Sequence, residues 1–199
     1  MLFRSAFKRM PFLREIELRG HLCLSENSFQ IILEAISACP ALFALILDFS
    51  TDNFTQQAMC TLSQFRKDFN RLRSFGFKLR RVPKVDPEAL SGFFTFLKNL
   101  DEIKELTLDF CISALDNSTL AHVAKTLPYL RNLRSLTLDF TFFPFRSAER
   151  LKDVLIAIKS MPKLTMLDLR NWHEHLKSSD IEFQLLQNPK LQFVLNPVR

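Results

Sequence analysis

Glycine is scarce in this sequence, with three residues in 199. Tight turns that need a positive φ angle therefore cannot be the main way in which the chain joins its secondary structure elements. Glycine-rich phosphate-binding loops, which open the nucleotide sites of doubly wound α/β folds, are also absent. No apolar run approaches the roughly 20 residues that a membrane-spanning helix requires. We therefore expect neither a doubly wound fold nor a membrane span.

Polar aromatic residues are equally rare. The chain has one Tyr and one Trp against 21 Phe, so its aromatic content suits interior packing better than wet recognition surfaces. The cysteines lie far apart, with no C-x-x-C pair and no histidine spacing typical of zinc sites; they are Cys23, Cys39, Cys60 and Cys111. Each falls among apolar residues or at an element end, where free thiols are common. This pattern indicates a reducing, intracellular setting.

Catalytic and metal-binding patterns are missing as well. His173 and His175 flank Glu174 at i, i+2 spacing without a third ligand nearby, which favours exposed loop histidines over a metal site. His21 and His122 stand alone, and the sequence shows no nucleophile elbow or carboxylate constellation. We expect a protein that is not an enzyme and that holds no cofactor or metal.

One repeated phrase, in contrast, runs through the whole sequence. Its opening apolar residue recurs in steps of 29, 30, 31, 30, 31 and 27, at Leu13, Leu42, Leu72, Ile103, Leu133, Leu164 and Leu191. In the first six copies two more apolar residues follow at +3 and +5, as Leu136 and Leu138 follow Leu133. That spacing is typical of a chain that turns a corner and then continues as a short strand. The last copy, Leu191, Val194 and Asn196, is weaker.

A helix-length segment lies between successive copies of the phrase. Apolar residues at helical spacing predict helices over 25–38, 56–69, 87–97, 118–127, 147–160 and 179–187. Asp86 and Pro87 form a favourable helix start. Prolines just ahead of four phrases stop the preceding helix; they are Pro11, Pro40, Pro128 and Pro162. Residues 1–12 predict the helix of a partial first repeat, although their basic, amphipathic character also fits a mitochondrial presequence.

These units predict an α/β solenoid. A single strand, loop and helix cannot bury both the inner face of the strand and the inner stripe of the helix, whereas stacked copies can. We expect one domain over 1–199 with about six to seven repeats of 27–31 residues. A curved parallel β-sheet would form the concave face and the helices the convex face. Residues 188–199 would be a degenerate last repeat.

The repeats resemble the leucine-rich repeat family, in its ribonuclease-inhibitor-like subclass, and the phrases at 106–110 and 136–140 are similar to ciliate repeats. The family usually places an Asn at the ninth position of the phrase, where it binds loop backbone groups. Here that position holds His21, Ser50, Arg80, Cys111, Thr141 and Trp172. We expect irregular loops after the third and sixth strands, with Phe49, Phe110 and Phe140 filling the space that the polar ladder normally organises.

The predicted concave face is the first candidate surface. Side chains between the buried leucines alternate to the other face of each strand and line it. Its charged candidates are Asp48, Lys78, Glu105, Asp109, Asp139, Asp168 and Arg170. One interpretation is a solvated face with charges balanced between neighbouring strands. The other is a docking groove for a basic peptide or helix.

The second candidate surface is basic. Residues 66–84 contain Arg66, Lys67, Arg71, Arg73, Lys78, Arg80, Arg81 and Lys84 against Asp68 alone. The whole chain has a formal charge of only +6, so the high pI originates in this stretch. It is either a solubilising helix end and loop or a contact for a phosphate backbone or an acidic partner. Single-stranded nucleic acid is not favoured, because no polar aromatic residues accompany the cations.

The third candidate surface is apolar. Phe142, Phe143 and Phe145 follow the fifth strand phrase within four residues. They either tuck under the neighbouring repeat or form an exposed anchor for a partner.

Together these features favour a non-enzymatic protein–protein interaction scaffold, as a subunit of a multi-subunit complex. Apolar residues at the two ends, with Leu2, Phe3 and Phe7 at one and 193–195 at the other, would face outward and need a cover. The alternatives are a substrate-receptor arm of a ubiquitin ligase, a common use of the resembled family, and a ribonucleoprotein subunit that contacts RNA through 66–84. We expect a cytoplasmic location, with mitochondrial as the alternative.

The strand phase gives a first testable prediction. Leu136→Ala should lower the free energy of unfolding by about 2 to 5 kcal/mol, because it truncates a core side chain, whereas Thr137→Ala should change it little. Urea denaturation of the two variants measures the difference. Equal effects at the two positions would contradict the assigned phase.

Overall fold

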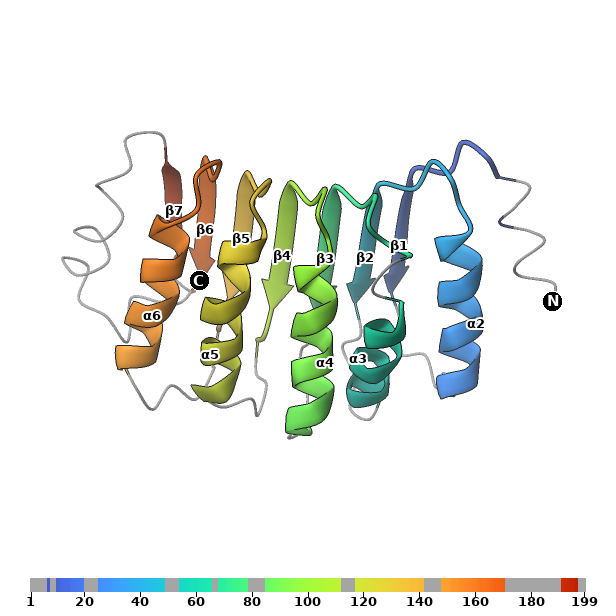
Figure 1. The fold of residues 1–199 in the computed structure, drawn as a ribbon, viewed down its shortest axis with the longest axis horizontal. Coiled ribbons are helices and arrows are strands. Elements are labelled where there is room, and N and C mark those ends of the chain that lie inside the picture. Colours follow the sequence, from blue (N-terminus) through green and yellow to red (C-terminus); the bar gives the residue numbers. More distant parts are fainter. Residues whose placement is uncertain are drawn as a thin grey trace.

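The computed structural model describes residues 7, 10–19, 25–48, 54–65, 68–78, 85–111, 117–141, 148–170 and 191–196. Within these ranges short strands alternate with helices (Figure 1). The strands are β1 (Glu15–Arg19), β2 (Ala44–Asp48), β3 (Ser74–Lys78), β4 (Glu105–Asp109), β5 (Ser135–Asp139), β6 (Met166–Arg170) and β7 (Gln192–Asn196). The helices are α2 (Glu26–Ser37), α3 (Phe54–Gln64), α4 (Pro87–Lys98), α5 (Asn117–Thr126), the 3-10 helix η1 (Leu127–Tyr129) and α6 (Ala148–Lys159).

The strands form one seven-stranded, all-parallel sheet in the order of the sequence, from β1 to β7. Each strand pairs with the next in a register that places the +3 residue of one phrase opposite the +3 residue of the following phrase, as with Phe75, Leu106 and Leu136. The expected parallel sheet with alternating helices is thus confirmed, and the arrangement is compatible with a repeat solenoid.

The last strand has a different register from the predicted one. Leu167 pairs with Phe193, and Leu169 pairs with Leu195. The prediction that Val194 and Asn196 occupy these places is therefore wrong by one residue. Because Phe193, Val194 and Leu195 are all apolar, the hydrophobic pattern alone could not distinguish the two registers.

The turns before β2 to β6 have the same backbone hydrogen bonds. The carbonyl oxygen of Arg14 accepts from the amides of Phe43, at 2.9 Å, and Ala44, at 3.1 Å. The carbonyl of Phe43 accepts in the same way from Arg73 and Ser74, at 2.7 and 2.9 Å. The same pair of bonds recurs at the next three turns, so the hydrogen-bonded ladder extends one residue ahead of the strands.

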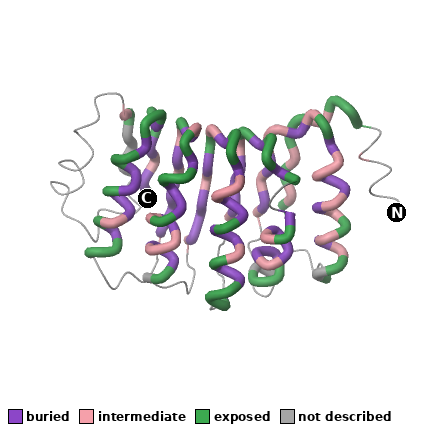
Figure 2. Tube along the Cα trace, viewed as in Figure 1, coloured by how far each residue is buried: buried purple, intermediate pink, exposed green. Residues whose placement is uncertain are grey.

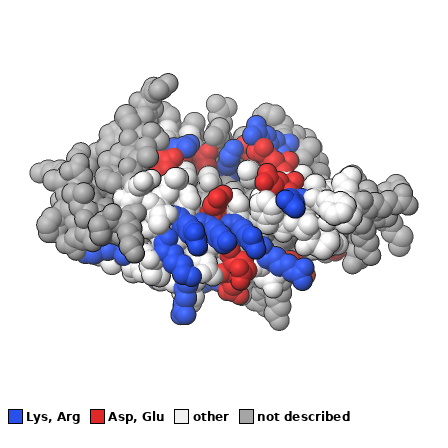
Figure 3. Space-filling view, turned by 90° about the horizontal axis from the view of Figure 1, so that it is seen from above, with Lys and Arg blue, Asp and Glu red and all other residues white. Residues whose placement is uncertain are grey.

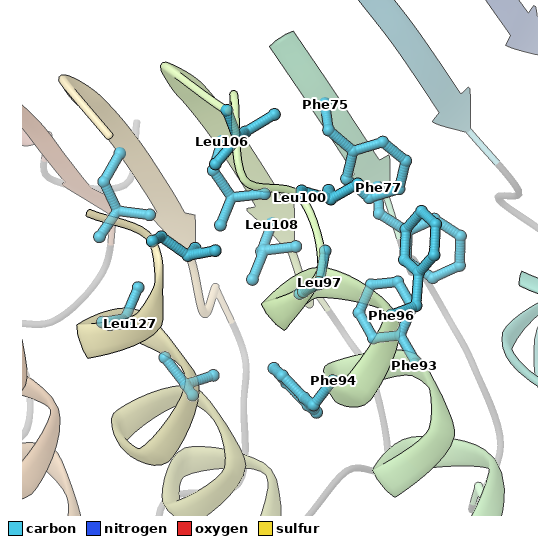
Figure 4. Packing of buried hydrophobic residues seen from close by; sticks show 14 of the residues in the cluster. Phe75, Phe77, Phe93, Phe94, Phe96, Leu97, Leu100, Leu106, Leu108 and Leu127 are labelled. Carbon is cyan, nitrogen blue, oxygen red and sulfur yellow. The ribbon is translucent and has the colours of Figure 1, made fainter. Parts of the chain in front are cut away.

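The described helices lie in one layer, on one face of the sheet (Figure 1). Burial alternates along the strands and follows one stripe of each helix, so the core lies between the two layers (Figure 2). The centre of the core is aromatic, with Phe75 and Phe77 of β3 against Phe93 and Phe96 of α4 (Figure 4). The ring centroids of Phe77 and Phe93 are 4.5 Å apart, which is within the range of favourable aromatic pairs.

Two helices begin directly after a residue whose side chain caps them. The Ser25 side chain accepts from the amide of Ser28 at the start of α2, and the Asp86 side chain accepts from the amide of Glu88 at the start of α4. Both caps satisfy amides that have no partner within the helix. The expected helices over 25–38 and 87–97 are confirmed to within one or two residues, whereas the segment 179–187 lies outside the described residues.

Helix α3 ends earlier than predicted. The pattern indicated a helix over 56–69, but α3 ends at Gln64 and the chain turns at 68–71. Phe69 belongs to this turn, where its carbonyl accepts from the amide of Leu72 at 3.1 Å. It is nevertheless buried and packs edge-on against Phe96. The prediction that the helix extends to Phe69 is therefore wrong, because an apolar residue in a turn can be buried as well as one on a helix.

Phe7 is less exposed than expected. Phe7 is partly buried and packs against the core, and its carbonyl accepts from the amide of Met10 at 3.0 Å. The exposed aromatic residue at this end is Phe12, with 85% of its surface accessible. Leu2 and Phe3 lie outside the described residues. Among the described helices, none combines the length and apolar character that crossing a membrane requires.

The aromatic core leads to a prediction with a matched control. Phe93→Ala should lower the free energy of unfolding by about 3 to 5 kcal/mol, because it removes a fully buried ring. Phe12→Ala makes the same chemical change at an exposed site and should cost less than about 1 kcal/mol. Chemical denaturation followed by circular dichroism measures both. Similar losses would contradict the assigned core.

Candidate functional site

The sheet face opposite the helices, called the open face below, presents three rows of side chains. The strand register aligns the first, third and fifth residues of neighbouring strands, so each row crosses the sheet. Across β1 to β6, the middle row is Glu17, Ile46, Gly76, Thr107, Thr137 and Asp168. The last row, at the carboxyl ends of these strands, is Arg19, Asp48, Lys78, Asp109, Asp139 and Arg170. No described helix lies on this face (Figure 1).

Charges in the last row are paired. Lys78 Nζ lies 3.3 Å from Asp48 Oδ2 on the neighbouring strand. Arg170 lies 3.8 Å from Asp139 Oδ2 and 2.9 Å from Asp168 Oδ2. The row holds three carboxylates and three cations, so it has no net formal charge. The geometry thus supports the predicted solvated face with balanced charges more strongly than an acidic groove, and binding of a partner there stays a prediction.

Two carboxylates of this row bind the second residue after their own strands. Asp109 Oδ1 accepts from the amide of Cys111 at 3.0 Å. Asp139 Oδ1 accepts from the amide and the hydroxyl of Thr141, at 2.9 and 2.6 Å. Both aspartates are buried. They supply the loop contacts for which the sequence pattern expected an Asn at positions 111 and 141, a role that the sequence reasoning did not assign to them.

The phenylalanines beside these aspartates, Phe110 and Phe140, belong to the core. Phe110 and Phe140 are fully buried, and their rings stack with centroids 5.3 Å apart and an interplanar angle of 28°. This placement confirms the prediction for these two residues, whereas Phe49 lies outside the described residues. The first two residues after β4 and after β5 are therefore fixed by a buried ring, at Phe110 and Phe140, and by a bond to an aspartate, at Cys111 and Thr141.

The predicted basic stretch is divided by strand β3. Arg71 and Arg73 are exposed just before β3, and Lys78 at its end pairs with Asp48. Its other members, Arg66, Lys67, Arg80, Arg81 and Lys84, lie outside the described residues. The same holds for the predicted apolar anchor, Phe142, Phe143 and Phe145, and for His173, Glu174 and His175.

A row of cations that the sequence reasoning missed crosses the edge at which the strands begin, called the amino edge below. Arg73, Lys104 and Arg134 directly precede β3, β4 and β5. The amide of Lys104 donates to the carbonyl of Arg73 at 2.7 Å, and that of Arg134 donates to the carbonyl of Lys104 at 2.8 Å. The three residues are therefore immediate neighbours, and Figure 3 shows Lys and Arg side chains gathered along this edge. The signal in the sequence is the residue after the opening apolar one of each phrase.

A hollow of about 370 Å³ adjoins this row. Its lining combines Pro40, Leu42 and Phe43 with Arg71, Arg73 and Glu102. Phe43 directly precedes β2, as Arg73 directly precedes β3. Because both residues line the hollow, it lies at the amino edge, beside the cationic row. Apolar residues, two arginines and Glu102 thus line one hollow at the amino edge.

Few side chains of the described residues have the properties of a reactive group. Burial raises the pKa of the Cys39 thiol, and its Sγ contacts the carbonyl oxygen of Ala35 at 3.7 Å. The hydrogen bond from Arg19 lowers the pKa of the exposed Glu17. The two residues form an ion pair on the surface. His122 stacks on Phe94 at 5.4 Å. No three His, Cys, Asp or Glu side chains within the described ranges are grouped so that they could hold a metal ion.

The fold and its surfaces define an α/β protein in which strands and helices alternate around an all-parallel sheet. No protein-family model matches the chain, and no curated protein is similar to it. Its function is therefore inferred from geometry.

The loop contacts of Asp139 generate a further prediction. Asp139→Ala should lower the free energy of unfolding by about 1 to 3 kcal/mol, because it leaves the amide and hydroxyl of Thr141 without their acceptor. Asp139→Asn retains an acceptor oxygen and should cost less. Asp153→Ala, which removes an ion pair on the surface of α6, should cost less than about 1 kcal/mol. Thermal and urea denaturation test this order, and a loss for Asp139→Ala no larger than that for Asp153→Ala would contradict it.

Proposed function

We propose that this protein is a non-enzymatic scaffold that binds a segment of another protein along the open face of its sheet. The main support for this proposal is that the described helices cover only one face of the sheet (Figure 1). Helices pack on one face, and the other presents rows of small, polar and charge-paired side chains in continuous register. A broad surface that several strands build together suits recognition of an extended protein segment.

The architecture on which this proposal rests is a leucine-rich repeat solenoid of the ribonuclease-inhibitor-like kind. The resemblance of the repeated phrase, the parallel strand order and the offset of about thirty residues between paired strands support it. In such an arc the strands line the inner surface, where several repeats contact one ligand together.

The side chains of the open face indicate which kind of protein segment it would bind. The middle row is uncharged across β2 to β5, where Ile46, Gly76, Thr107 and Thr137 stand side by side. Gly76 lets the neighbouring side chain cover it, because an added Cβ would lie 3.3 Å from two carbons of Ile46. Since the charges of the last row are balanced, a segment of mixed or low charge fits this surface better than a strongly basic one.

We further propose that the chain is a subunit of a larger assembly. The support comes from the β1 end, where Leu13, Ile16 and Leu18 are only partly buried, unlike their counterparts in the central strands. Phe12 and Met10 at this end have 85% and 49% of their surface exposed. Exposed and partly buried apolar side chains that lie together are a surface on which another protein can pack.

Affinity purification with paired variants tests the open face. Thr107→Arg combined with Thr137→Arg places two long cations in the uncharged middle row and should reduce recovery of a specific co-purifying protein by at least about tenfold. The control, Ser91→Arg with Thr95→Arg, adds the same charge to the exposed side of α4 and should leave recovery within about twofold. Both variants are checked by circular dichroism for an intact fold.

The two pairs of variants distinguish binding at the open face from a general effect of added charge. Loss of the partner in the open-face variant alone supports the proposal. Equal recovery with both variants, or equal loss from both, contradicts it.

A further inference from the structure

We infer that the amino edge of the sheet is a second binding surface, which takes an acidic, helical protein segment that also presents one apolar side chain. Arg73, Lys104 and Arg134 provide its cationic row, and the hollow at Phe43, whose lining is partly apolar, provides a place for the apolar side chain. This surface is separate from the open face, so the inference does not depend on the proposed function.

The cations are held at a regular spacing. Because they occupy the same position on three neighbouring strands, their backbones are separated by the interstrand distance of about 4.8 Å. Arg73 and Arg134 are exposed, and Lys104 between them is half-buried. Among the described residues no carboxylate lies within ion-pair distance of any of the three side chains. This lack of partners distinguishes the amino edge from the last row of the open face, where the cations Lys78 and Arg170 are paired.

The spacing fits one face of an acidic helix. Carboxylates at i and i+3 or i+4 of a helix lie about 5 to 6 Å apart, close to the interval between the strands. A helix that crosses the strand starts can therefore set successive carboxylates opposite Arg73, Lys104 and Arg134, within the reach of their long side chains. Such alignment makes the contacts depend on register as well as on net charge.

The hollow adds a requirement beyond charge. Pro40, Leu42 and Phe43 give it apolar walls, and Phe43 lies next to Arg73 because the amide of Arg73 donates to the carbonyl of Phe43 at 2.7 Å. An apolar side chain one turn beyond the last carboxylate of the helix would enter it. Burial of a large apolar side chain contributes affinity that salt does not screen, unlike that of ion pairs between exposed charges.

The acids on the same edge disfavour a phosphate backbone. Glu102 lines the hollow and Glu105 is exposed directly after Lys104. A nucleic acid has a charge at every nucleotide and meets these carboxylates wherever it crosses the row, whereas a peptide can place uncharged residues there. Single-stranded binding would also use stacked aromatic side chains, and the aromatic residue beside the row, Phe43, is only half exposed.

The test uses the full chain and a fluorescein-labelled synthetic helical peptide with glutamate at every third or fourth position and one leucine a turn beyond them. We expect measurable binding by fluorescence anisotropy. Arg73→Glu combined with Arg134→Glu should weaken it at least about tenfold, as expected when attractive contacts become repulsive. The matched control, Lys125→Glu with Lys152→Glu, changes the net charge equally on exposed helix positions and should change binding by less than about twofold.

A second comparison leaves the charges unchanged. Phe43→Ala should weaken binding of the leucine peptide several-fold but not of the same peptide with alanine in place of leucine. This pair of peptides keeps the inference testable even where a protein variant folds poorly, because the change lies in the ligand. Circular dichroism spectra check each variant.

Three results would overturn the inference. They are no binding of the peptide, an equal loss in the control variant, which would indicate unspecific charge attraction, and tighter binding of an oligothymidylate of the same net charge. In the last case the amino edge would be a nucleic-acid surface.

Discussion

Contacts between residues about thirty positions apart in the sequence hold this structure together. The strands are five residues long, too short to be stable on their own, and each finds its hydrogen-bond partners only in the preceding and following units. The helices bury their apolar stripes against the sheet in the same way. No unit can complete its core alone. The regular spacing of about thirty residues between the phrases is therefore required for folding.

This offset explains how much of the fold could be predicted. The phrase opened by Leu42, Leu72, Ile103 and Leu133 predicted the strand positions and their register, because a leucine-type residue is buried wherever the phrase recurs. The prediction was wrong where several neighbouring residues could satisfy the pattern, as at 193–195. The end of α3 was also placed too late, because this copy lacks a proline before its phrase and Phe69 is buried from a turn.

The candidate surfaces were harder to predict than the fold. Periodicity places Asp109 and Asp139 on the open face, but it does not show that each binds the amide of the residue two positions ahead. The cationic row was missed for a different reason. Arg73, Lys104 and Arg134 are unremarkable in the sequence and become neighbours only when three strands align, whereas the run of cations at 66–84 attracted attention because its members are adjacent in sequence.

The packing around α4 has a consequence for how the protein opens. Rings from β3 and α4 concentrate in the middle of the array, while the apolar residues of β1 at one margin are only half covered. Units with few buried apolar contacts open more readily than units that are packed on both sides. Amide protons should therefore exchange earlier in β1 than near Phe93, where the aromatic rings keep the backbone closed longest.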